Sequence, residues 1–212
     1  MEPVELIALT MGVGWASGIN LYAAVMMLGL LGMTGNIELP QSMQVIQSPL
    51  VLGTAAIMYL VEFLIDKVPG VDTAWDAVHT FIRIPAGAML AASAVGEATP
   101  AVELAAFLTG GGLAATSHTV KAGSRAVINT SPEPMSNWIT SITEDFVAIG
   151  GLYAALNHPI EFLIFLVLFI LFSIWFIPKI WHGIKRVYGY IQRFFLSRKD
   201  PDSEPTKTPT KD

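Results

Sequence analysis

Two stripes of polar and charged residues interrupt an otherwise apolar sequence. Within residues 110–137, four side chains spaced i, i+3, i+7 and i+11 share one side of a helix: His118, Lys121, Arg125 and Asn129. A second set, spaced i, i+4, i+7 and i+11, does the same: Asp72, Asp76, His79 and Arg83. Charged groups inside hydrophobic segments are costly in a membrane, so both stripes mark candidate functional sites.

The two stripes allow three interpretations. The aspartates of one stripe can pair with Lys121 and Arg125 of the other and lock two halves of the protein together. The same ion pairs can act as a gate that breaks during transport. Alternatively, an anion or a phosphate headgroup binds there, because the basic and imidazole side chains outnumber the two aspartates: Arg83, His118, Lys121 and Arg125.

Metal and catalytic chemistry find less support in the sequence. Asp72, Asp76 and His79 share a helix face that a metal ion could use, but no zinc-protease or EF-hand pattern accompanies them. The chain has no cysteine and no nucleophile elbow, and the adjacent Ser117 and His118 point to different sides of a helix. We therefore expect no enzyme activity, no resident metal and no cofactor.

The composition is typical of a membrane protein. Of 212 residues, 53% are hydrophobic and 14% are charged, whereas soluble domains carry about 25% charged residues. The mean hydropathy is +0.56. These values indicate an all-α, polytopic membrane protein with one membrane domain, residues 1–178, and no nucleic-acid partner.

Six hydrophobic segments organise that domain. By residue number they are 4–33, 50–66, 86–95, 101–120, 138–156 and 160–177, and the third is short unless residues 73–84 belong to it as a half-helix. We expect Asp72 to cap the helix that begins at Thr73, and Pro85 to break or kink that helix. Pro132 and Pro134 should separate the fourth segment from the fifth.

The first segment has features of a broken helix. Its middle is rich in glycine, carries Ser17 and Asn20, and places Gly14 four residues before Gly18, a spacing typical of close helix packing. The alternative is that freed backbone groups in this region line a cavity. The fourth segment is also rich in glycine, and we expect both segments to be broken or re-entrant helices that meet at the centre.

Acidic residues in the other segments are candidates for ion pairing or proton coupling. Glu62 lies late in the second segment, where it either snorkels to the interface or forms a buried ion pair or proton site. Glu144 and Asp145 lie in the first half of the fifth segment.

Residues 179–199 continue from the sixth segment as a basic amphipathic helix. Its apolar side carries four β-branched residues: Ile180, Ile184, Val187 and Ile191. We expect this helix to lie on membrane lipids of an anionic leaflet. Residues 200–212 are rich in Pro, Thr, Lys and Asp, and we expect them to be disordered.

The distribution of basic residues predicts an orientation. With six spans, every Lys and Arg falls on one side of the membrane if both termini are cytoplasmic. Six spans also divide into two groups of three, and a repeat of three must be inverted. The Ser48-Pro49 and Ser131-Pro132 steps precede corresponding segments of such a repeat. The sequence thus allows an inverted three-plus-three repeat.

One extended motif resembles a known family. It combines Ser117-His118, Lys121-Ala122, Arg125 and the run NTSPEPMSN at residues 129–137. Residues 15–20 and 66–76 resemble the same family, a bacterial inner-membrane family known only as a domain of unknown function. The similarity covers about residues 4–171. It implies a place in the bacterial inner membrane and brings no known activity.

These observations lead us to expect transport of a small anionic solute or lipid headgroup. Ser17, Asn20 and the nearby glycines would line the path, and Glu62, Glu144 or Asp145 would couple to protons. The groups that would handle negative charge are Arg83, His118, Lys121 and Arg125, with Asn129 as a further binding or gating candidate. The alternative is a non-transporting scaffold, in which the stripes are structural locks and the basic helix recruits lipid or a partner. A homo-oligomer is compatible with either function.

Overall fold

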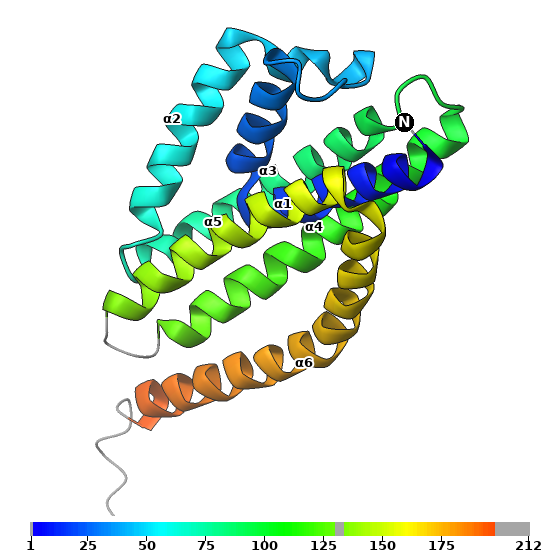
Figure 1. Ribbon diagram of the computed structural model, residues 1–212. Helices are drawn as coiled ribbons and strands as arrows, with labels where there is room; N and C mark the ends of the chain where they lie inside the picture. Colours follow the sequence, from blue (N-terminus) through cyan, green and yellow to red (C-terminus); the bar gives the residue numbers. More distant parts are fainter. Residues whose placement is uncertain (1, 130–133, 198–212) are drawn as a thin grey trace, which may run out of the picture.

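Every element that the structure describes is helical. The computed structural model describes residues 2–129 and 134–197 (Figure 1). The elements are α1 (Pro3–Met33), the 3-10 helix η1 (Gln41–Gln47), α2 (Pro49–Ile65), α3 (Val71–Ala94), α4 (Pro100–Ile128), α5 (Pro134–Asn157) and α6 (Pro159–Ser197). The predicted all-α class is confirmed. The expected disordered tail, residues 200–212, lies outside the described residues.

Close packing of small residues brings α1, α3 and α4 together. A Cβ atom on Gly14 would lie 2.7 Å from the Cα of Gly110, and a Cβ atom on Gly87 would lie 2.8 Å from the Cβ of Ala114. Because these positions carry little or no side chain, the helix backbones approach one another directly. The predicted close packing at Gly14 is therefore present. It leaves no room for a wide transport path between α1, α3 and α4.

Helix α1 is broken at Asn20, as the sequence predicts. Asn20 has extended backbone angles (φ −146°, ψ 98°) inside an otherwise helical run. Its side-chain oxygen accepts a hydrogen bond from the backbone N–H of Ala23 at 2.9 Å, which caps the second half of the helix. That half turns away and packs on η1 and α2, where Gly29 meets Ile46 and Leu52 (Figure 1).

Helix α4 is continuous, which corrects the expectation of a second broken segment. The glycines at 110, 111 and 112 stay helical. Gly110 and Gly111 stay so because they pack against Ala91 and Ala88 of α3. The packing contacts therefore stabilise the helix where glycine alone would weaken it.

Two prolines also fail to interrupt their helices. Helix α3 runs from Val71 through Pro85, with Gly70 as its N-cap at φ +85°, so Asp72 lies in the first turn instead of capping it. Pro85 is tolerated because buried residues hold the helix on both sides, Arg83 before it and Gly87 after it. Likewise, α6 passes through Pro178.

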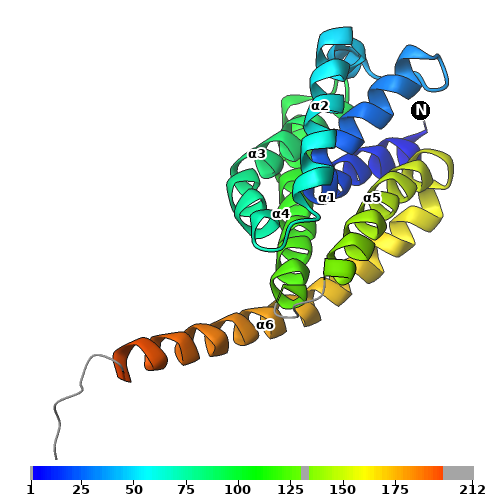
Figure 2. The same cartoon turned by 90° about the vertical axis from the view of Figure 1, so that its left-hand side faces the viewer.

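The helix α6 contains the predicted basic amphipathic helix as its last part. Figure 2 shows this part extending away from the other helices. Ile180, expected on the lipid side, is instead 7% exposed and packs on Gly123 of α4. The structure does not describe the side chains of the rest of the predicted stripe, which are Ile184, Val187 and Ile191.

The number of membrane spans is smaller than expected. Within the described residues, three helical stretches are long and apolar enough to cross a membrane: Pro3–Met33, Met135–Asn157 and Pro159–Gly183. A fourth is added if η1 and α2, which bend by 63°, count as one broken span. Helix α2 alone has 17 residues, short of the roughly 20 that a bilayer needs. Helices α3 and α4 are not among these spans, because their charged stripes interrupt the apolar stretch.

The predicted inverted repeat also finds no support in the helix directions. Gly14 of α1 faces Gly110 of α4, and five residues further on the carbonyl of Ile19 accepts a hydrogen bond from Lys121. Helices α1 and α4 therefore run in the same direction. In an inverted repeat they would be equivalent helices and would run in opposite directions. The apolar helices identify a membrane protein; which membrane, and which side each terminus faces, stay predictions.

The glycine contacts predict a position-specific effect on stability. We expect Gly14→Ala to lower the free energy of unfolding by about 1–3 kcal/mol, because its methyl group would overlap the backbone of Gly110. Gly112→Ala is the matched control, since nothing lies within 4 Å of its added Cβ. It should leave stability unchanged or raise it by up to about 1 kcal/mol. Thermal unfolding in detergent measures both, and equal effects would contradict the packing.

Candidate functional site

The two predicted stripes face each other across α3 and α4. Arg125 Nη1 lies 3.6 Å from Asp72 Oδ2, and Lys121 Nζ lies 4.0 Å from Asp76 Oδ1. Arg83 Nη1 donates to Asp76 Oδ1 at 3.0 Å and lies 3.3 Å from His118 Nδ1. The pairing between stripes that the sequence suggests is therefore present.

Two further helices add carboxylates to these stripes. Glu62 of α2 lies 2.7 Å from Arg83 and 3.0 Å from Lys121, so it forms buried ion pairs and does not snorkel. Asp66, just after α2, lies 3.3 Å from Lys121 and 3.0 Å from Arg125. Glu144 of α5 accepts one bifurcated hydrogen bond from Arg125 Nε, which lies 3.2 Å from each carboxylate oxygen.

Asp66 was not among the candidates from sequence. Its signal was present, because Asp66 follows Glu62 by four residues and so lies on the same side of the helix. Its position at the end of the segment made an interfacial place the simpler expectation. The structure instead leaves Asp66 only 2% exposed.

We call these eight residues the charge cluster: Glu62, Asp66, Asp72, Asp76, Arg83, Lys121, Arg125 and Glu144. Seven of them are at most 4% exposed, and the Glu144 side chain is 14% exposed. Five are carboxylates and three are cationic, which leaves an excess of two negative charges if all are ionised. The expectation that basic groups predominate here is therefore wrong, because it counted only two of the five carboxylates.

The neighbouring histidine does not reduce this excess. His118 Nδ1 faces Arg83 Nη1, which can only donate a hydrogen bond, so Nδ1 must accept and the imidazole is neutral. Its Nε2 lies 2.7 Å from the hydroxyl of Thr80.

Several carboxylate oxygens of the charge cluster have no hydrogen-bond partner. In the described residues these buried atoms are Glu62 Oε2, Asp66 Oδ1 and Asp76 Oδ2. Burial of an unpaired negative charge is costly, and a carboxyl group responds by binding a proton. Burial raises the pKa of the Asp66 carboxyl above its ordinary value, although Lys121 and Arg125 act to lower it. The charge cluster is thus suited to hold protons.

Asn20 and Asp145 form a separate polar contact. Asn20 Nδ2 donates to Asp145 Oδ1 at 2.9 Å, and the hydroxyl of Tyr59 donates to Asp145 Oδ2 at 3.1 Å. This contact ties the break in α1 to α5 and α2. It places Asp145 outside the charge cluster, beside the hinge of α1.

The remaining candidates have individual partners. Ser17 donates to the carbonyl of Val13 at 2.6 Å and is fully buried. His79 stacks on Trp75 with ring centroids 4.0 Å apart and contacts Tyr22. Asn129 donates to both oxygens of Asp72, at 2.9 and 3.0 Å.

The structure does not bring the suggested metal ligands together. Asp72 faces Arg125 and Asn129, Asp76 faces Arg83, and His79 faces Tyr22. Among the described residues no group of three or more metal-ligating side chains has the geometry to hold an ion.

One cavity reaches the charge cluster, and we call it the side cavity. It has a volume of about 410 Å³ and lies between α1, α4, α5 and α6. Its polar lining residues are Ser117, Lys121, Ser124, Thr140, Thr143 and Glu144. Trp15, Phe165 and Phe169 are among its apolar ones. Ser17, Asn20 and His118 do not line it, because they are buried between the tightly packed helices.

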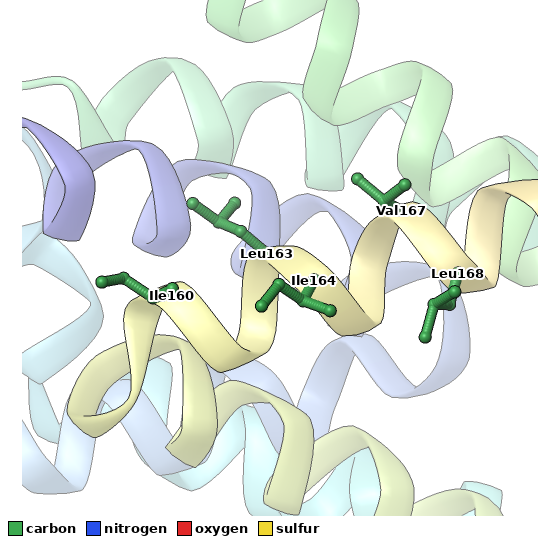
Figure 3. Close-up of a pocket in the computed structure, with 5 residues that line it drawn as sticks. All are labelled: Ile160, Leu163, Ile164, Val167 and Leu168. Atoms are coloured by element: carbon green, nitrogen blue, oxygen red, sulfur yellow. The ribbon is translucent and has the colours of Figure 1, made fainter.

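A different hollow, of about 360 Å³, lies on the outer side of α6. Figure 3 shows its lining, which is entirely aliphatic: Ile160, Leu163, Ile164, Val167 and Leu168. All five side chains come from one helix, so this surface suits contact with lipid chains and offers no polar chemistry.

The chain belongs to the DUF4126 family, a domain of unknown function whose family model matches residues 7–179. No curated protein matches the chain. No solved structure matches it either. The family resemblance expected from the motif is thus confirmed at the level of an uncharacterised domain.

The charge imbalance predicts opposite responses to loss of positive and negative groups. We expect Lys121→Met to lower the free energy of unfolding by about 3–5 kcal/mol, because it removes one of three cations facing five carboxylates and leaves Glu62 with Arg83 alone and Asp66 with Arg125 alone. Asp76→Asn should cost less or even stabilise, because its oxygen can still accept from Arg83.

Unfolding of both variants in detergent measures this difference. Lys185→Met is the control for loss of a positive charge, since Lys185 is exposed. A larger loss for Asp76→Asn than for Lys121→Met would show that carboxylates are not in excess.

Proposed function

We propose that this member of the family is a membrane transporter that exchanges protons for a positively charged cargo at the charge cluster. The observation that carries the proposal is the excess of carboxylates over cationic groups in a buried place, five against three among the described residues. An excess of two buried negative charges needs protons or cations to neutralise it.

The charge balance argues against an anionic cargo. Lys121 uses its three N–H groups on the carbonyl of Ile19, on Glu62 and on Asp66. Arg125 is engaged through all three of its nitrogens by carboxylates and by the carbonyl of Asp66. The remaining N–H of Arg125 faces Asp72 Oδ2 at 3.6 Å, so neither side chain offers a free donor to an incoming anion. Arg83 keeps a buried Nε without a hydrogen-bond partner, but its guanidinium faces Glu62 and Asp76 and does not line the side cavity. The charge balance therefore favours a cationic cargo over the anion expected from sequence.

Access to the charge cluster is one-sided. Glu144 is its most exposed member, and together with Lys121 it lines the side cavity. Beyond Arg83 and His118, the small residues of α1, α3 and α4 close the interior, with Gly14 against Gly110 and Gly87 against Ala114. A transport cycle therefore requires these close contacts to loosen while the side cavity narrows.

The break in α1 supplies a place for such a motion. Asn20 separates a first half packed on α4 and α5 from a second half packed on η1 and α2. Hinge positions in transporters are commonly broken helices whose backbone groups find partners elsewhere. Here Asp145 holds the hinge, because it accepts hydrogen bonds from both Asn20 and Tyr59.

A second candidate is the scaffold function, in which the charge cluster is a structural lock. It is favoured by the burial of Asn20 (1% exposed) and His118 (3% exposed), which line neither the side cavity nor the hollow on α6. A stoichiometric partner that is lost on deletion of residues 179–199, with no ion flux at any pH, would select this function.

The transporter proposal predicts proton movement that depends on Glu144. Proteoliposomes that contain a pH dye and are loaded with an organic cation such as choline should show protein-dependent proton influx when the outside is free of that cation, because exchange couples cation exit to proton entry. Glu144→Gln should reduce the influx to the level of empty vesicles, because it removes the carboxylate that the side cavity exposes. Glu161→Gln on the exposed start of α6 should leave the influx unchanged.

A second measurement guards against loss of folding. Because five buried carboxylates face three cations and Asp66 Oδ1 has no hydrogen-bond partner, the infrared C=O band of a protonated carboxyl group should be present in the folded protein and should weaken in Asp66→Asn. A folded protein with neither this band nor proton influx would contradict the proposed function.

A further inference from the structure

We propose that the side cavity binds an amphiphilic amine in its protonated form, with the ammonium group beside Glu144 and the apolar body between the aromatic side chains. This inference rests on the proposed function, since it names the chemical class of the cargo. It goes beyond that function because binding can be measured without transport.

The size and the walls of the side cavity suit a small amphiphile. Its volume of about 410 Å³ lies in the range of small-molecule sites, roughly 300–1,000 Å³. On one side Trp15 packs edge-to-face against Phe165 and Phe169, with ring centroids 5.4 and 5.8 Å apart. Aromatic rings of this kind contact both an apolar body and a nearby cation favourably.

The hydroxyl groups of the lining act as acceptors. Ser124 donates its hydrogen to the carbonyl of Val120 at 2.8 Å, and Thr143 donates to that of Ile139 at 2.7 Å. Ser117 and Thr140 likewise donate to backbone carbonyls. Each hydroxyl oxygen keeps lone pairs, so it can accept a hydrogen bond from a ligand but has no hydrogen to give.

The charged groups of the lining point to the same ligand chemistry. The hydrogens of Lys121 are used by Ile19, Glu62 and Asp66, which leaves the Glu144 carboxylate as the accessible charge. Apart from the indole N–H of Trp15, the polar lining is therefore composed of acceptors. A group with several donors and a positive charge, such as an ammonium, matches this surface, whereas a carboxylate or phosphate does not.

The location of the side cavity favours a ligand that partitions into lipid. Phe165 and Phe169 belong to α6, whose neighbouring residues Ile164 and Leu168 are 58% and 60% exposed. The same helix therefore borders both the cavity and the lipid-facing surface in Figure 3. An amphiphile can reach Glu144 along this helix with its apolar body remaining in an apolar environment.

Three probes of matched shape test the inference: 4-phenylbutylamine, the neutral 4-phenylbutanol and the anionic 4-phenylbutyrate. Calorimetric titration of the full-length protein in phosphatidylglycerol nanodiscs should show the amine binding about 10–100-fold more tightly than the alcohol, the gain of a hydrogen bond to a charged group. The carboxylate should not bind. Equal binding of amine and alcohol, or tighter binding of the carboxylate, would overturn the inference.

Two variants locate the site. Glu144→Gln should reduce the amine affinity to that of the alcohol, while Glu161→Gln, on the exposed start of α6, should leave both unchanged. Phe169→Ala keeps the charge cluster intact and should weaken the amine and the alcohol alike, because it removes part of the shared apolar wall. Amine binding that survives both Glu144→Gln and Phe169→Ala would place the ligand elsewhere and contradict the inference.

The amine can belong to a free molecule or to a lipid headgroup, and nanodisc composition distinguishes the two. If phosphatidylethanolamine discs weaken the binding of the amine probe, the lipid amine competes for the site and is its occupant. If the binding is unchanged, the occupant is a free amine. If the amine binds but no proton influx is found, the proposed function fails alone. If influx depends on Glu144 but the amine does not bind, only the inference fails.

Discussion

The excess of carboxylates in the charge cluster is the constraint on which the rest of the structure depends. Arg83, Lys121 and Arg125 each contact at least two carboxylates, and these come from α2, α3, α5 and the turn after α2. The three cations thus hold four helices and a turn at fixed distances from one another. Buried charges lose their hydration on folding. The charge cluster is therefore stable only while its ion pairs are intact and its two excess negative charges are neutralised.

Much of this arrangement follows from local spacing, and the remainder depends on tertiary contacts. The stripes at 72–83 and 118–129 are predictable because helical periodicity decides which residues share a side. The break at Asn20 is predictable from glycine and polar residues in an apolar run. The convergence of Glu62, Asp66 and Glu144 on Lys121 is not, because it depends on how α2 and α5 approach α4. The two stripes alone therefore give the wrong sign for the net charge of the cluster, because they lack Glu62, Asp66 and Glu144.

The same burial weakens the orientation inferred from basic residues. The positive-inside rule applies to Lys121 and Arg125 only if they flank a span at the membrane surface. Both belong to α4 and are buried, with exposed fractions of 4% and 0%. Charges that are paired in the protein interior do not report which leaflet they face, since the rule concerns loops near the ends of spans. The span count failed for a related reason: α3 and α4 are apolar towards their surroundings while their inner sides carry charge.

The contact between Ile180 and Gly123 has a mechanical consequence. Ile180 lies at the start of the basic part of α6, and Gly123 lies between Lys121 and Arg125 on α4. A Cβ atom on Gly123 would lie 2.5 Å from Ile180 Cδ1, so the two helices touch with no spare space. Helix α6 also supplies Phe165 and Phe169 to the side cavity. A tilt of the last part of α6 would therefore move two things together: the wall of the side cavity, through Phe165 and Phe169, and the backbone of α4 beside Lys121 and Arg125.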